Sequence, residues 1–167
     1  MLGFCCRLTP GATLTGSEST ELLENFCSNP WEYQHTFETP LKDLQSFVEA
    51  IVSAGGEIRT GSLVIDQVVF EPKTLIAILT DNSISLPSKR GLCLAAVGPQ
   101  EIEELLMTVL SEWIDFLFIP GPPSFAIYAD HDEYTTFYAH DRISLDRMAR
   151  VLSDRGFKQV TNYERSF

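Results

Sequence analysis

Apolar residues recur at helical spacing in widely separated parts of this chain. They form such stripes in residues 41–52, 102–113 and 145–152, where apolar positions three or four apart make one face of a helix. Each stripe has to be buried against a core, and no linker-like stretch separates one stripe from the next. The pattern therefore predicts a single domain over residues 16–167, preceded by a loose segment at residues 1–15.

Strand-like segments lie between these helices without a strict β-α-β order. Residues Trp31–Glu38 alternate apolar and polar side chains without a break, which is typical of a half-buried strand. Two apolar runs, 63–70 and 74–80, are separated by turn residues that include Pro72, and they predict a hairpin. A further helix is expected from Ser17 to Cys27.

Cap residues and short apolar runs complete the predicted architecture. Pro99 suits the first position of the helix that carries the 102–113 stripe, and Gly156 suits the end of the last helix. Strands are expected at 92–97, 114–119 and 158–164. Hairpins mixed with separate helices indicate an α+β fold, with an antiparallel or mixed sheet and about four helices packed on it.

The chain is strongly acidic, with 12 basic and 23 acidic residues and a net charge of −11. Residues 1–141 hold 20 acidic and 6 basic residues, a balance of −14, whereas residues 142–167 hold 3 and 6, a balance of +3. Such a surface repels nucleic-acid phosphates and anionic lipids, and it speeds the encounter with basic proteins. We expect a basic protein partner, no nucleic acid and no membrane, although acidity also serves solubility alone.

The cysteines bear on the cellular compartment. Cys5, Cys6, Cys27 and Cys93 form no C-x-x-C pair and have no regular spacing, which is typical of reduced thiols in a cytoplasmic protein. The adjacent pair Cys5-Cys6 has acylation or oxidation as an alternative. No apolar run approaches the roughly 20 residues that span a bilayer. Because the first residues also lack a basic leader and a long apolar stretch, we expect a cytoplasmic location.

The densest polar cluster lies at the expected turn of a hairpin formed by Phe125–Ala129 and Tyr134–Ala139. If Ala129 pairs with Tyr134, His140 lies about 20 Å from the turn at the rise of a β-strand, so a metal site that uses both of the nearby histidines is not expected. The turn residues are Asp130, His131, Asp132 and Glu133, and they are flanked by Tyr128 and Tyr134.

Three explanations of this cluster remain open. Aspartate and its neighbours stabilise chain reversal, so the cluster has a purely structural explanation. Loops also contact partners, and tyrosine suits interface hot spots. Metal binding or acid–base catalysis is the third explanation, although carboxylates alone hold calcium or magnesium weakly. Because the sequence contains no G-x-S-x-G, no P-loop and no H-E-x-x-H, we expect no cofactor and no catalytic metal.

The leading hypothesis is a non-enzymatic acidic binding protein, such as an inhibitor or immunity-type protein that neutralises a basic toxin. Size, acidity and the lack of catalytic motifs favour it; the alternative is a small hydrolase or metal-dependent enzyme that uses the Asp130–Glu133 turn. Reversing the charge of Asp130, Asp132 and Glu133 together should weaken binding without unfolding the protein. Acidic residues beside the 102–113 stripe are expected to be exposed and to extend the partner surface. They are Glu101, Glu104 and Glu112.

Overall fold

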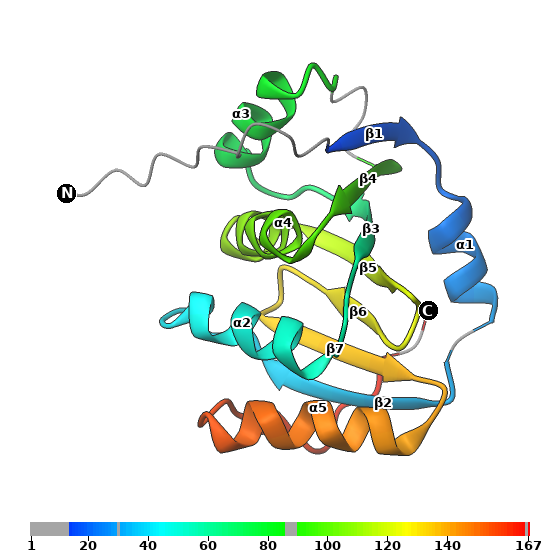
Figure 1. Cartoon of the computed structure of the whole chain (residues 1–167), viewed down its shortest axis with the longest axis vertical. Helices are drawn as coiled ribbons and strands as arrows, with labels where there is room; N and C mark the ends of the chain where they lie inside the picture. Colours follow the sequence, from blue (N-terminus) through cyan, green and yellow to red (C-terminus); the bar gives the residue numbers. More distant parts are fainter. Residues whose placement is uncertain (1–13, 30, 86–89, 166) are drawn as a thin grey trace.

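An antiparallel sheet runs through the part of the chain that the computed structural model describes, residues 14–29, 31–85, 90–165 and 167 (Figure 1). Within these residues it has eight strands in the order β1-β4-β3-β5-β6-β7-β2-β8, and five helices accompany it. The predicted α+β class is confirmed, and the fold is richer in sheet than expected. The elements are β1 (Thr15–Glu18), α1 (Glu21–Ser28), β2 (Tyr33–Glu38), α2 (Leu44–Ala54), β3 (Thr60–Gln67), α3 (Lys73–Asp81), β4 (Leu92–Val97), α4 (Pro99–Ser111), β5 (Asp115–Gly121), β6 (Ala126–Ala129), β7 (Tyr134–Ala139), α5 (Arg142–Asp154) and β8 (Gln159–Val160).

Helices α2, α4 and α5 form a layer over one face of the sheet, with α2 in contact with both of the others (Figure 1). These are the helices predicted from the three apolar stripes. Their inward faces bury Phe47 and Ile51 of α2, Leu106 of α4 and Leu152 of α5. Gly156 follows α5 with a φ of 85°, a left-handed conformation that glycine adopts without strain, so the predicted helix end is confirmed.

The opposite face of the sheet is buried in its middle as well. Phe116 and Phe118 of β5 belong to the core under the helix layer, whereas Leu117 between them belongs to a second core on the other side. Leu23 and Phe26 of α1 pack into this second core. A central strand buried on both faces explains why β5 reads as a continuous apolar run instead of an alternating one.

The hairpin predicted over 63–70 and 74–80 is wrong. The first run contains most of β3, but the second forms helix α3. Leu75, Ile78 and Leu79 are the buried residues of α3, and their spacing of three and four positions places them on one helical face. The turn residues around Pro72 therefore start a helix here instead of closing a hairpin.

Several boundaries also differ from the prediction. The helix expected from Ser17 starts at Glu21, because Ser17 belongs to β1 and pairs with Cys93 of β4. Thr15, expected in the loose segment, is part of β1 as well, while residues 1–13, with Cys5 and Cys6, lie outside the described residues. The strand expected at 158–164 is shortened to Gln159–Val160. In the described part of the chain, no helix has the length and apolar character needed to cross a membrane.

Candidate functional site

The β6–β7 turn is longer than predicted by one residue. Ala129 pairs with Thr135, not with Tyr134. The side chain of Asp130 explains the difference, because its Oδ1 accepts the backbone N–H groups of Asp132 at 3.0 Å and of Tyr134 at 3.2 Å. The backbone N–H of Asp130 also donates to the carbonyl of Tyr134 at 3.1 Å. Asp130 therefore fixes the shape of the turn from inside.

His131 is held by a carboxylate that the sequence analysis did not single out. Asp115, the first residue of β5, is 5% exposed and accepts both the backbone N–H and the ring Nδ1–H of His131 at 2.8 Å. The hydrogen bond to Asp115 raises the pKa of His131. The other ring nitrogen, Nε2, lies 3.8 Å from the carboxylate of Asp132. The imidazole is thus oriented by Asp115 and leaves Nε2 toward the surface.

The second oxygen of Asp130 binds a residue from a distant part of the sequence. Its Oδ2 accepts from Nη2 of Arg165, and the side chains of the two residues are 7% and 12% exposed. The guanidinium lies over the ring of Tyr128, with 4.6 Å between its carbon and the ring centre. Arg165 also approaches the ring of Tyr163 at 5.7 Å. Asp130 is therefore part of a buried ion pair, not an exposed charge.

Tyr128 is buried too, contrary to its expected place at a partner surface. It is 5% exposed, and its hydroxyl donates to Asp66 at 2.6 Å. Asp66 accepts a further bond from Nε of Arg90 at 3.0 Å. Burial raises the pKa of Tyr128, and the hydrogen bond to Asp66 adds to the effect. Tyr134 is half-buried and packs on Tyr163, with 4.8 Å between the ring centres.

The turn consequently has a buried half and an exposed half. Asp130 forms the buried half with its ion pair, and His131 lies at the boundary. Asp132 and Glu133 form the exposed half; the side chain of Asp132 is 77% exposed. Glu133 has a φ of 71°, and within the described residues it takes part in no ion pair. A charge-reversed variant that includes Asp130 would therefore disturb the fold, which corrects the earlier expectation.

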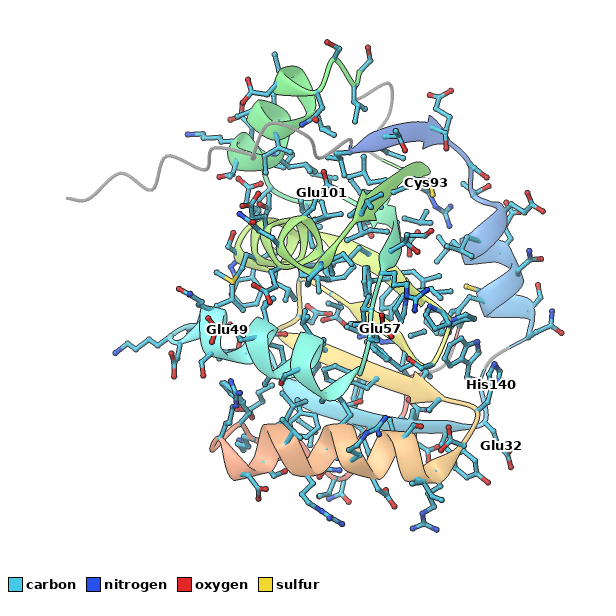
Figure 2. All side chains as sticks on the ribbon, in the orientation of Figure 1. Glu32, Glu49, Glu57, Cys93, Glu101 and His140 are labelled. Atoms are coloured by element: carbon cyan, nitrogen blue, oxygen red, sulfur yellow. The ribbon has the colours of Figure 1, made fainter. Side chains whose placement is uncertain are left out.

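The acidic residues of α4 do not form one exposed surface with the turn. Glu101 was expected to be exposed but is 4% exposed, and its Oε2 accepts the backbone N–H of Val97 at 2.5 Å. Figure 2 shows Glu101 between α4 and β4. The reason is that a glutamate in the first helical turn folds back on the N-terminus of its helix. Glu104 is half-buried and accepts from Gln100 at 3.3 Å.

Glu112, at the other end of α4, has a structural role in the fold. Its two carboxylate oxygens accept the backbone N–H groups of Thr74 at 2.6 Å and of Leu75 at 2.9 Å. These N–H groups are in the first turn of α3, whose N-cap residue Pro72 offers no side-chain acceptor. Glu101 and Glu112 are about 16 Å apart at the rise of an α-helix, so they do not form one acidic patch.

Other candidate chemistry is sparse in the described part of the chain. No group of three or more His, Cys, Asp or Glu side chains converges there in a way that suits a metal ion. Cys27 and Cys93 are half-buried free thiols, and burial raises the pKa of both. Raised thiol pKa values disfavour the reactive thiolate form.

Comparisons with known proteins do not place this chain in a family. No family model matches it, and no curated protein and no solved structure matches it either. The function is therefore inferred from its own residues.

Proposed function

We propose that this chain is a non-enzymatic binding protein that docks a basic protein on the exposed half of its β6–β7 turn. The observation that supports this most is the fixed outward position of Asp132 beside Glu133. The side chain of Asp132 is 77% exposed, while its backbone N–H is tied to buried Asp130 at 3.0 Å. Charged groups on a preorganised loop lose little conformational entropy when they bind.

The charge of the whole chain supports a basic partner. The net charge is −11, and a negative charge of this size repels acidic proteins and attracts basic ones. The exposed arginines Arg142, Arg147 and Arg150 gather on α5, in the helix layer. A basic partner would therefore meet an uneven field, which orients its approach before contact.

An inhibitor or immunity-type protein that neutralises a basic toxin is the specific role that we propose. The size of the chain, 167 residues, and its acidity fit a compact stoichiometric inhibitor. Half-buried Tyr134 beside the exposed carboxylates supplies an aromatic side chain of the kind found at interface hot spots.

The test is capture of a partner by the immobilised full chain, followed by mass spectrometry. We expect a basic protein to be retained by the wild type and lost from the Asp132→Lys/Glu133→Lys variant. The matched control is Asp81→Lys/Asp154→Lys, which makes the same change in net charge at exposed residues near the ends of α3 and α5. Lysine is favourable near a helix C-terminus, so the control should fold. Equal capture by all three chains would refute docking at the turn.

A hydrolase is the second candidate, and one observation favours it. Asp115 orients His131 through Nδ1 at 2.8 Å, as a carboxylate orients the general base of many hydrolases. One observation opposes it. Enzymes usually bind their substrates in a pocket, but two open hollows of this structure lie beside Glu57 and Arg59, just before β3, at the opposite end of the sheet from His131. Turnover of ester or phosphoester substrates by the wild type, and its loss in His131→Gln, would favour the enzyme.

A further inference from the structure

The guanidinium of Arg165 lies between two side chains, Asp130 and Tyr128, on the sheet face that α1 also covers, and we call this pair the arginine pocket. The pocket consists of the carboxylate of Asp130 and the ring of Tyr128, whose centre lies 4.6 Å from the guanidinium carbon. The ring of Tyr163 lies 5.7 Å from the same carbon, but it belongs to the segment that carries Arg165. A carboxylate combined with aromatic faces is the chemistry that recognises a guanidinium group. Because Asp130 is buried and the Arg165 side chain is mostly buried, water screens their interaction weakly.

The receptor side of this pocket is held by groups outside the segment that carries Arg165. Oδ1 of Asp130 accepts two backbone N–H groups of the turn, at 3.0 Å and 3.2 Å. The hydroxyl of Tyr128 is fixed by Asp66 at 2.6 Å. A pocket preorganised in this way keeps its acceptors in place when the guanidinium leaves, and it is therefore ready to take another.

The closing segment, which we define as residues 161–165 together with Phe167, contacts the sheet mainly through side chains. None of these residues belongs to a helix or strand. Gln34 of β2 accepts the backbone N–H of Arg165 at 3.1 Å and donates to its carbonyl at 3.5 Å, so one side-chain amide contacts both backbone groups. The ring of Phe167 lies 5.0 Å from Tyr128 and 5.4 Å from Phe26, yet Phe167 is 52% exposed.

The fit of this segment is incomplete. Nε of Arg165 is buried and has no hydrogen-bond partner among the described residues. Burial lowers the pKa of the Arg165 guanidinium, which reflects the unfavourable removal of this charge from water. An unsatisfied buried donor weakens the hold of the closing segment on the pocket.

We propose that the pocket of Asp130 and Tyr128 is a receptor for an arginine side chain of another protein, in a segment that carries an aromatic residue two positions after the arginine. The closing segment, with Arg165 and Phe167 at this spacing, occupies the receptor in the unbound protein and competes with that partner. The inference goes beyond the proposed function, because it uses the buried half of the turn. Either one can fail while the other holds.

The test uses the full chain with Arg165→Ala and a capped, fluorescent peptide with the sequence of residues 161–167. Anisotropy should show that this peptide binds the variant, and that an otherwise identical peptide with alanine for arginine binds at least about tenfold more weakly. A peptide with lysine should also bind more weakly than the arginine peptide, because lysine lacks the planar fork. The wild-type chain should bind the arginine peptide at least about tenfold more weakly than the variant, since its own Arg165 competes.

Control variants separate the pocket from the general charge. Asp130→Asn in the Arg165→Ala chain should remove the preference for the arginine peptide, whereas Asp154→Asn on the exposed face of α5 should not. If circular dichroism shows that Arg165→Ala is unfolded, Gln34→Ala takes its place, because it loosens the closing segment and leaves the pocket intact. Equal binding of the arginine and alanine peptides to a folded variant, or no binding of either, would overturn the proposal.

Discussion

Asp130 and Asp132 lie two positions apart in one turn, but their carboxylates have opposite surroundings. Asp130 is buried and accepts hydrogen bonds from two backbone N–H groups and from Arg165, whereas Asp132 is exposed. A buried carboxylate that loses its cation leaves a desolvated charge, and an exposed one does not. Residues of the same type therefore have different roles: Asp130 contributes to stability, and we propose that Asp132 contributes to partner encounter.

We predict that Asp130→Asn lowers the free energy of unfolding by about 3 kcal/mol, because it leaves the buried guanidinium of Arg165 without a counter-charge. Asparagine retains an acceptor for the backbone of the turn, so the change tests the ion pair. Urea unfolding measures the effect. The matched change Asp132→Asn should stay within about 0.5 kcal/mol of the wild type. Similar values for the two variants would show that the ion pair with Arg165 is not formed.

His131 predicts a pH dependence of stability. Its pKa in the folded protein is raised above the usual 6.5 by the hydrogen bond to Asp115. A raised folded pKa means that the stabilisation is fully present below about pH 6.5 and is lost as pH rises through the folded pKa. The free energy of unfolding of the wild type, compared with that of His131→Gln at each pH, should fall across this window. A constant difference from pH 6 to pH 8 would contradict the prediction.

At the scale of elements, α3 depends on Glu112, the residue that follows α4. Pro72 at the start of α3 has no side-chain acceptor, and Glu112 bonds to the N–H groups of Thr74 and Leu75 instead. We predict that Glu112→Ala lowers stability by about 1–2 kcal/mol, the usual effect of removing a helix cap. Hydrogen exchange should accelerate first in α3. Glu71→Ala, an exposed change just before the helix, is the control, and equal effects would argue against the cap.

The sequence predicts elements well where the period of apolar residues is long and unambiguous. The stripes of α2, α4 and α5 extend over several turns, and those helices were predicted. In α3 the periodic residues Leu75, Ile78 and Leu79 are few, so the same short apolar run also fits a strand and the sequence alone predicts one. The register of β6 and β7 was missed by one residue, because the Asp130 side chain sets the length of the turn and pairing rules alone do not include it.

The candidate site was only partly predictable because it joins distant parts of the chain. The turn itself was identified from its local cluster of polar residues. Asp66, Asp115 and Arg165 have no distinctive pattern in their own segments. Their roles depend on the fold, which brings them to Tyr128, His131 and Asp130 respectively. The sequence contains one local signal for Asp115: a charged residue stands at the start of the apolar run that forms β5.

The two cores of the molecule share the same strands, which predicts a single cooperative unit. Strand β5 gives Phe116 and Phe118 to one core and Leu117 to the other, and β3 divides Leu63 and Val64 in the same way. If either core unfolds, the strands that the other core also needs are disrupted. Thermal unfolding should therefore show one transition with the same midpoint by far-UV and near-UV circular dichroism. Two separate midpoints would contradict a single domain.

The most direct test of the central claim is the association rate of the purified basic partner at different salt concentrations. For the wild type we predict a steep fall in the rate from about 0.01 M to about 0.15 M ionic strength, as the Debye length shortens from about 30 to about 8 Å, with a smaller change in dissociation. In Asp132→Lys/Glu133→Lys the association should be slower and its salt dependence weaker than in the Asp81→Lys/Asp154→Lys control. An association rate that is indifferent to salt, or identical in the two variants, would contradict docking on the acidic turn.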